Sequence, residues 1–167
     1  MLTKSDIEQY FLAEKIGGMQ MLCIGVAAIL IAAICYFNIK NNWTYGFIIP
    51  LMVVGFIQVA VGFTVYNKSD DDRKNMVYAY DLRPEKLRNE DLPRMEKVSK
   101  LFLVLKYVEL ILMAISVIII LLYGSNQSRT FWVGLAMGLL IQATVSFLAD
   151  VVAEKRGKIY LEKLRGF

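Results

Sequence analysis

Four long blocks of apolar residues constrain the fold of this chain more than any other feature. They cover residues 19–37, 45–65, 101–123 and 130–149. Each is close to the roughly 20 residues that a helix needs to cross the apolar core of a bilayer. A single segment satisfies its own backbone hydrogen bonds in that core only as a helix. We therefore expect an all-α membrane protein of one domain, residues 1–167, in which a four-helix bundle spans the membrane.

Lys and Arg are distributed very unequally among the segments outside these blocks. Residues 38–44 and 124–129 contain one each, whereas the N-terminal tail, residues 66–100 and the C-terminal tail contain sixteen together. Positively charged loops stay on the cytoplasmic side of a membrane. The distribution predicts a membrane protein with both termini and residues 66–100 in the cytoplasm. It also explains the net charge of +4, so we expect membrane lipid around the protein and no nucleic acid as a partner.

The two halves of the chain resemble each other. Phe47 aligns with Phe131, and at the same offset Gln58 aligns with Gln142. Each half then consists of a charged entry helix, a span, a tight outer loop and a second span. Because two spans return the chain to the same side, the alignment predicts two parallel helical hairpins related by an axis along the membrane normal.

The segment before the first block predicts a short amphipathic helix. Thr3 or Ser5 is placed to cap it, and Tyr10 and Phe11 are expected in the headgroup layer. The acidic residues in this segment argue against a cleavable signal peptide, which begins with a basic region.

Residues 66–100 form the one long polar segment of the chain. We expect the second span to continue past Tyr66, followed by a broken connector and a long helix from about Arg94, with Asp91 as a cap. The acidic run that opens this segment favours a solvated charged surface over a divalent-cation site, since adjacent residues on a helix point about 100° apart. The residues expected to contact a protein partner here are Asp70, Asp71, Asp72, Arg73, Arg83 and Arg88.

Polar residues inside the apolar blocks are the main candidates for function. Lys106 and Glu109 lie three apart, and Ser116 lies on the same helical face. Counted from the inner ends of their spans, Gln58, Glu109 and Gln142 lie at one depth. We expect one polar network of Gln58, Lys106, Glu109, Ser116 and Gln142. Such a layer either fixes which helix faces which or binds a solute or proton.

Small residues inside the blocks predict close helix packing. Gly134 and Gly138 form a GxxxG pair in the last block. Contacts of this kind serve packing within the chain, a partner's transmembrane helix, or a homo-oligomer. The glycines expected at helix contacts are Gly25, Gly55, Gly62, Gly134 and Gly138.

The chain contains no histidine, which removes the commonest general base and metal ligand. No nucleophile with a base, phosphate-binding motif or metal-ligand pattern accompanies the apolar blocks. We therefore expect a protein that is not an enzyme and needs no cofactor or metal. The main alternative is a small-solute or multidrug-type transporter that uses Glu109, although pairing with Lys106 would remove the free carboxylate that a cation exporter needs.

The stretches LTKSDIEQYFLAEK, VGFTVY, VYAYDLRPEKL and DLPRMEKV resemble a family of small, uncharacterised four-span inner-membrane proteins of Bacteroidota bacteria. The layout is also similar to that of immunity proteins of interbacterial toxin systems. This resemblance implies a protein of the bacterial inner membrane that binds a toxin or a membrane complex. Because the two outer loops are short and the polar segments lie on the inner side, we expect the partner to be met from the cytoplasm or within the bilayer.

Overall fold

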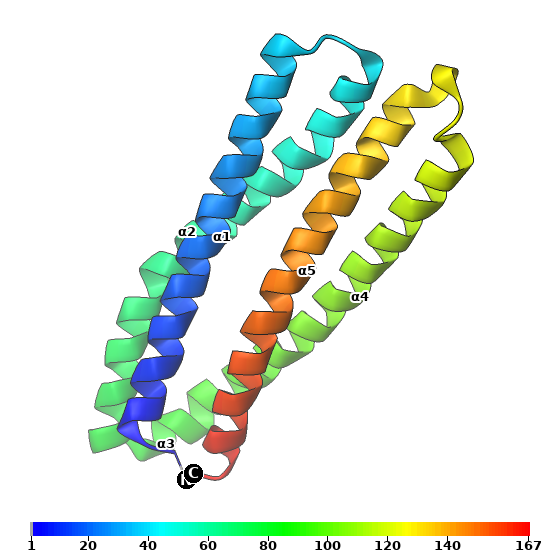
Figure 1. The fold of residues 1–167 in the computed structure, drawn as a ribbon. Coiled ribbons are helices and arrows are strands. Elements are labelled where there is room, and N and C mark those ends of the chain that lie inside the picture. The colour runs from blue at the N-terminus through cyan, green and yellow to red at the C-terminus, as the bar shows by residue number, and fades with distance from the viewer. Residues whose placement is uncertain (1) are drawn as a thin grey trace.

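The computed structural model describes residues 2–167 and places most of them in four long helices (Figure 1). These are α1 (Lys4–Asn38), α2 (Asn42–Leu82), α4 (Leu92–Tyr123) and α5 (Thr130–Arg165). A short helix, α3 (Pro84–Lys86), and a π-helical turn, η1 (Leu87–Asp91), connect α2 to α4, and a 3-10 turn, η2 (Gln127–Arg129), precedes α5. The described residues contain no strand. The prediction of an all-α bundle of four helices is confirmed, and each helix is long and apolar enough to cross a membrane.

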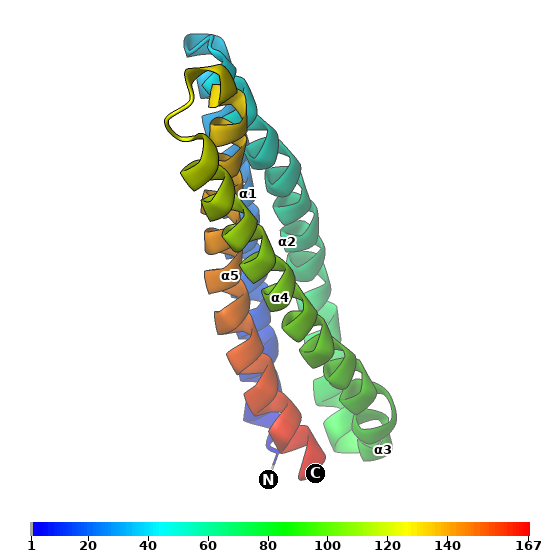
Figure 2. The same ribbon diagram turned by 90° about the vertical axis from the view of Figure 1, so that its right-hand side faces the viewer.

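The helices form two hairpins that lie side by side. The α1–α2 hairpin contacts the α4–α5 hairpin mainly through α2 and α5, and both chain termini lie at the same end (Figure 1). Figure 2 shows α4 crossing over α5 on the outside of the bundle. In the part of the chain described, α4 packs along α5 but has no comparable contact with α1 or α2. The surface of α4 that faces away from α5 therefore has no comparable contact with another long helix of the described chain.

The helix ends follow local capping rules. Thr3 forms a capping box with Asp6, whose backbone N–H donates to the Thr3 side chain at 3.3 Å. Asn41 caps α2 by accepting from the Thr44 N–H at 2.7 Å. Arg83 leaves the helical conformation (φ −146°, ψ 65°), because the proline that follows it disfavours a helical residue at this position.

Two expectations about the polar segments are corrected. The amphipathic N-terminal segment is not a separate helix, because α1 continues without a break into the apolar block. Phe11 is only 1% exposed and packs in a protein core, so it does not lie in a headgroup layer. Asp91 does not cap a helix, since its carboxylate is buried against side chains of other elements.

Glycines allow the backbones of neighbouring helices to touch. In α1 and α2, Gly25 faces Gly55 and Gly18 faces Gly62, at a spacing of seven residues on each helix. A Cβ atom added to Gly62 would lie 2.6 Å from the backbone nitrogen of Leu22. A seven-residue repeat keeps one seam between two helices that coil gently around each other.

The α2–α5 contact depends on the same principle. A Cβ atom on Gly134 would clash with the carbonyl oxygen of Trp43, and one on Gly46 with that of Phe131. A Cβ atom on Gly138 would lie 2.6 Å from the carbonyl oxygen of Phe47. The five glycines expected at helix contacts thus all lie at close approaches of α1 to α2 or of α2 to α5.

Replacement of glycine by alanine is expected to have opposite effects on protein stability at Gly62 and at Gly157. Gly62→Ala is expected to destabilise the protein by about 1–3 kcal/mol, because the added methyl group meets backbone atoms that cannot rotate away. Gly157→Ala is the matched control. Its Cβ would lie 3.6 Å from the flexible end of Met95, and alanine favours a helix over glycine by about 1 kcal/mol.

Thermal unfolding of both variants in detergent micelles, followed by circular dichroism, checks this prediction. The Gly62→Ala midpoint should fall and the Gly157→Ala midpoint should stay or rise. Equal midpoints for Gly62→Ala and the unmodified protein would contradict the packing described here.

Candidate functional site

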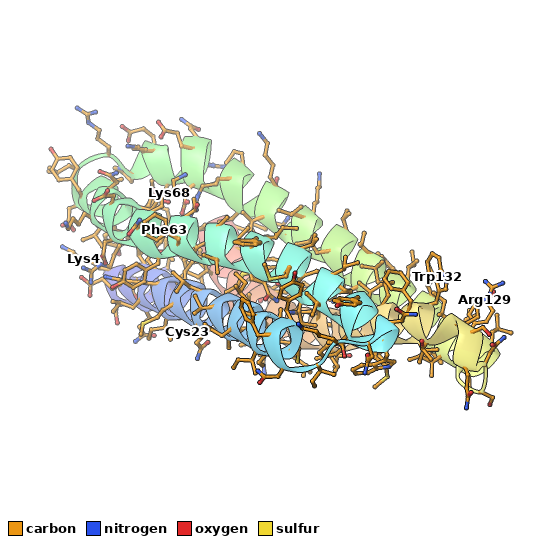
Figure 3. All side chains as sticks on the ribbon, turned by 90° about the horizontal axis from the view of Figure 1, so that it is seen from above. Lys4, Cys23, Phe63, Lys68, Arg129 and Trp132 are labelled. Carbon is orange, nitrogen blue, oxygen red and sulfur yellow. The ribbon has the colours of Figure 1, made fainter. Side chains whose placement is uncertain are left out.

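The helices continue well beyond their apolar blocks at the end that holds the two termini. We call this part, residues 2–18, 66–100 and 150–167, the head. Lys4 and Lys68 lie toward this end and Arg129 and Trp132 at the opposite one (Figure 3). The head has its own hydrophobic core, formed by all four long helices and η1. Its buried members are Leu2, Ile7, Phe11, Met76, Ala79, Leu87, Met95, Tyr160, Leu161 and Leu164.

A buried polar cluster joins the connector to the C-terminal helix inside the head. Asp91 of η1 is fully buried, and its carboxylate accepts a hydrogen bond from the Tyr160 hydroxyl at 2.7 Å. The Arg94 side chain donates to the same carboxylate at 2.8 Å and its guanidinium lies 5.4 Å from the Phe11 ring centroid. A buried carboxylate persists in a protein interior when it is paired and hydrogen-bonded in this way. The cluster therefore fixes the connector against α1 and α5.

A second polar cluster, in which the α1 side chains are half-buried, lies on the α1 side. The ring of Tyr10 stacks on that of Tyr160 with centroids 4.2 Å apart, and the Tyr10 hydroxyl donates to Glu14 at 3.3 Å. Ser69 of α2 lies 3.4 Å from the other Glu14 oxygen. Burial raises the pKa of Glu14 above its ordinary value, because removing a carboxylate from water disfavours its charged form.

Ion pairs between helices surround this core. Lys4 pairs with Asp81 at 2.5 Å, Lys15 pairs with Asp70, and Arg165 pairs with Glu96 at 2.9 Å. The hydrogen bond from Lys163 lowers the pKa of Asp6 to about 2. Each pair joins two different helices, so the charges of the head hold its helices in register.

The residues predicted to contact a partner divide into two groups. Asp70 and Arg73 pair with each other, and Asp72 lies 3.9 Å from Arg94, so these three take part in contacts within the head. Asp71, Arg83 and Arg88 are exposed and have no ion-pair partner among residues 2–167.

The same part of the chain contains two exposed apolar residues of α2. Tyr78 is 59% exposed and Leu82 is 62% exposed. Asp71, Lys74, Tyr78 and Leu82 are spaced by three or four residues and share one helical face. We use the name docking face for this helical face together with the two exposed arginines that follow it in the chain; it comprises Asp71, Lys74, Tyr78, Leu82, Arg83 and Arg88. Sequence reasoning missed Tyr78 and Leu82, because an apolar residue in a polar segment does not reveal whether it is buried.

The expected polar layer within the apolar blocks is divided in two. The Gln58 amide donates to Gln142 at 3.3 Å and to Ser146 at 3.1 Å, across the α2–α5 contact. Glu109 and Ser116 instead face α5 from α4, where the Ser116 hydroxyl donates to the carbonyl of Leu112 in its own helix. No hydrogen bond between described residues joins the two parts.

Lys106 pairs with a residue that the sequence spacing did not suggest. Its Nζ lies 2.6 Å from Glu154 of α5, and Lys158 binds the other oxygen of the same carboxylate at 2.7 Å. Glu109 has no ion-pair partner among residues 2–167 and is 8% exposed. The helix spacing placed Lys106 and Glu109 on one face, but the neighbouring helix supplies the partner of Lys106.

Comparisons of the chain with protein-family models, with curated proteins and with solved structures find no match. The described residues also contain no group of three or more acidic or cysteine side chains arranged to hold a metal ion.

The pKa of Glu14 predicts a pH-dependent effect of one substitution. Because the folded state raises this pKa, folding is favoured fully below the ordinary value of about 4 and loses stability as the pH rises through the folded-state value. Glu14→Gln removes that loss, so the variant should be more stable than the unmodified protein near about pH 8 and should lose this advantage near about pH 4.

Unfolding midpoints at the two pH values provide the measurement. Glu8→Gln, at an exposed position of the same helix, is the control and should leave the pH dependence of the midpoint unchanged. A Glu14→Gln variant that is equally destabilised at both pH values would contradict the assignment.

Proposed function

We propose that this chain is an integral membrane protein, without enzymatic activity, that acts by binding another protein through the docking face. The partner is a membrane-associated toxin that the protein neutralises, or a membrane complex of which it is an accessory subunit. The observation that carries this proposal is the exposure of Tyr78 and Leu82 at the end of α2, followed in the chain by the exposed, unpaired Arg83 and Arg88. Aromatic and arginine side chains are the most frequent energetic centres of protein interfaces.

Position along α2 argues that this face meets protein and not lipid. Tyr78 lies thirteen residues beyond the end of the apolar block at residue 65, which is about 20 Å along a helix. Such a side chain is well outside the bilayer. Large apolar residues exposed to water in this way mark interaction surfaces.

The expected orientation of the protein favours a cytoplasmic partner. The exposed apolar side chains of the four blocks, such as Phe56 and Leu121, suit contact with lipid. The excess of Lys and Arg in the head favours a cytoplasmic location for that end by the positive-inside rule. The opposite end offers only residues 39–41 and the turn around η2.

Reversing the charge of the docking face should weaken the binding of a partner that uses this face. The double variant Arg83→Glu/Arg88→Glu and the single variant Tyr78→Ala are expected to weaken binding by more than about 2 kcal/mol. Glu162→Lys, also an exposed charge in the head but on α5, is the matched control and should leave binding unchanged.

The partner is sought among the products of the neighbouring genes. Deletion of this protein should harm cells only when its toxin is produced, and the unmodified chain and Glu162→Lys should restore growth. If all docking-face variants that insert into the membrane also restore growth, the docking face is not the binding site.

A small-solute transporter is the second candidate, because Glu109 is buried without an ion-pair partner. In that case Glu109→Gln should abolish uptake or resistance for some solute while leaving partner binding intact. Loss of function through the docking face with an unaffected Glu109→Gln variant would remove this candidate.

A further inference from the structure

Helices α1 and α5 lie side by side at the end of the molecule that holds the termini (Figure 1). Between them the surface of the head contains a groove of about 260 Å³, which we call the α1–α5 groove. Gln9 and Ala13 of α1 and Arg156 and Ile159 of α5 are among the residues that line it. The groove lies on other helices than the docking face, so a ligand bound there is compatible with a partner on α2.

The Arg156 side chain is held in place across α1. It is half-buried, and its Nη1 donates to the backbone carbonyl of Ala13 at 2.6 Å. Its Nη2 occupies the space beside Gly17, since a Cβ atom added to that glycine would lie 2.7 Å from it. A guanidinium group has five N–H donors, and the Ala13 carbonyl is the one acceptor that residues 2–167 provide for it. Most of its donors therefore remain available to a ligand.

Arg156 gives the groove a net positive charge. No carboxylate among residues 2–167 forms an ion pair with it. Asp6, the one acidic residue among the described residues that line the groove, already binds Lys163 at 2.7 Å. Lys15, another cation of the head, is likewise neutralised by Asp70. The groove therefore presents one uncompensated positive charge, which suits an anionic group.

The guanidinium group lies at the depth that lipid headgroups are expected to occupy. Gly17 and Ala13 stand two and six residues before the first apolar block, which begins at residue 19. These separations correspond to about 3 and 9 Å along a helix. A bilayer about 40–45 Å thick with a hydrocarbon core of about 30 Å has roughly 5–8 Å for each headgroup layer. The phosphate of a lipid would therefore meet Arg156 without leaving its layer.

Apolar side chains lie between the groove and the apolar blocks. Ile16 of α1 is 58% exposed and Val152 of α5 is 57% exposed. Ile16 follows Ala13 by three residues, and Val152 precedes Arg156 by four, so each shares a helical face with a residue of the groove. A lipid whose phosphate binds Arg156 would place its acyl chains along these side chains.

We propose that the α1–α5 groove binds an anionic phospholipid of the leaflet next to the head, with the lipid phosphate on Arg156. A guanidinium group binds phosphate through two parallel N–H groups and so fixes its orientation. A zwitterionic lipid also brings an ammonium group, whereas the carboxylate of Asp6 is already bound by Lys163. The proposal rests on the proposed insertion of the chain into a membrane, but not on the docking face.

Native mass spectrometry of the whole protein, purified in detergent and titrated with phosphatidylglycerol or phosphatidylcholine, tests the site. The unmodified protein should bind phosphatidylglycerol more tightly than phosphatidylcholine. Arg156→Gln should weaken phosphatidylglycerol binding about tenfold or more, as expected for the loss of a hydrogen bond to a charged group. Lys155→Gln is the matched control. It removes the same charge at an exposed position of α5 that points about 100° away from Arg156, so binding should be unchanged.

A photoactivatable phosphatidylglycerol in vesicles locates the lipid on the unmodified protein. Adducts should map to residues 9–20 of α1 and 152–163 of α5. This measurement decides the question alone should Arg156→Gln fail to fold through loss of its hydrogen bond to Ala13. A chain that does not float with the vesicles would contradict both the membrane insertion and this site, whereas a chain that floats without adducts in the groove contradicts this site alone.

The titrations also separate a specific lipid site from other anion binding. The proposal is overturned if Arg156→Gln and Lys155→Gln weaken binding equally, because a general effect of surface charge then explains the result. It is also overturned if phosphatidylcholine binds as tightly as phosphatidylglycerol, or if inorganic phosphate competes as well as the lipid at equal concentration.

Discussion

The direct contact of helix backbones at glycine is the interaction on which the rest of this structure depends. Gly25 of α1 contacts Gly55 of α2 and so fixes these two helices on each other. Gly134 and Gly138 of α5 both contact the backbone of α2 and fix α5 on it. Lipid is as apolar as leucine, so burial of large apolar side chains gives little preference for one helix arrangement in a bilayer. Close approach provides that preference because it gains van der Waals contact along the whole seam. With α2 held on both sides, the directions of α1 and α5 are set.

Those directions determine what happens in the head. Each long helix continues without a break from its apolar block into the head. The packing of the blocks therefore sets the positions of the helix ends, where the ring of Phe11 in α1 contacts the ring of Tyr160 in α5. Outside the apolar blocks, burial of apolar side chains stabilises the fold, and the head has a hydrophobic core of its own. The protein thus combines two packing regimes, backbone contact through small residues in the blocks and side-chain burial in the head.

Local sequence patterns predicted the parts of this structure that depend on local physics. The four helices, the cap at Thr3 and the continuation of α2 past Tyr66 follow from apolar length, capping chemistry and proline placement. The core of the head was not predicted, because Phe11 and Tyr160 lie in short apolar stretches within charged segments, and such stretches do not reveal whether they are buried. Asp91 and Tyr160 are 69 residues apart, and nothing in either segment indicates the other.

The charged residues in the blocks also show that local sequence patterns do not predict contacts between helices. Spacing along α4 correctly placed Lys106 and Glu109 on one face, yet the partner of Lys106 is Glu154 of α5. A spacing rule describes neighbours within one helix, whereas the neighbours supplied by another helix depend on rotation and register. Sequence patterns of a single helix do not specify that rotation and register.

The long helices also differ in how many of their side chains are buried. In α2 and α5, glycines, amides and core side chains are buried along the whole length, whereas α4 buries only Met95, Glu109 and Ser116. At the end that holds the termini, α4 is held by Glu96 with Arg165 of α5 and, through the connector before it, by Asp91 with Tyr160. Within its apolar block α4 has neither a backbone contact at glycine nor an amide pair such as Gln58 with Gln142. A displacement of α4 about this end would therefore disturb fewer contacts than a displacement of any other long helix.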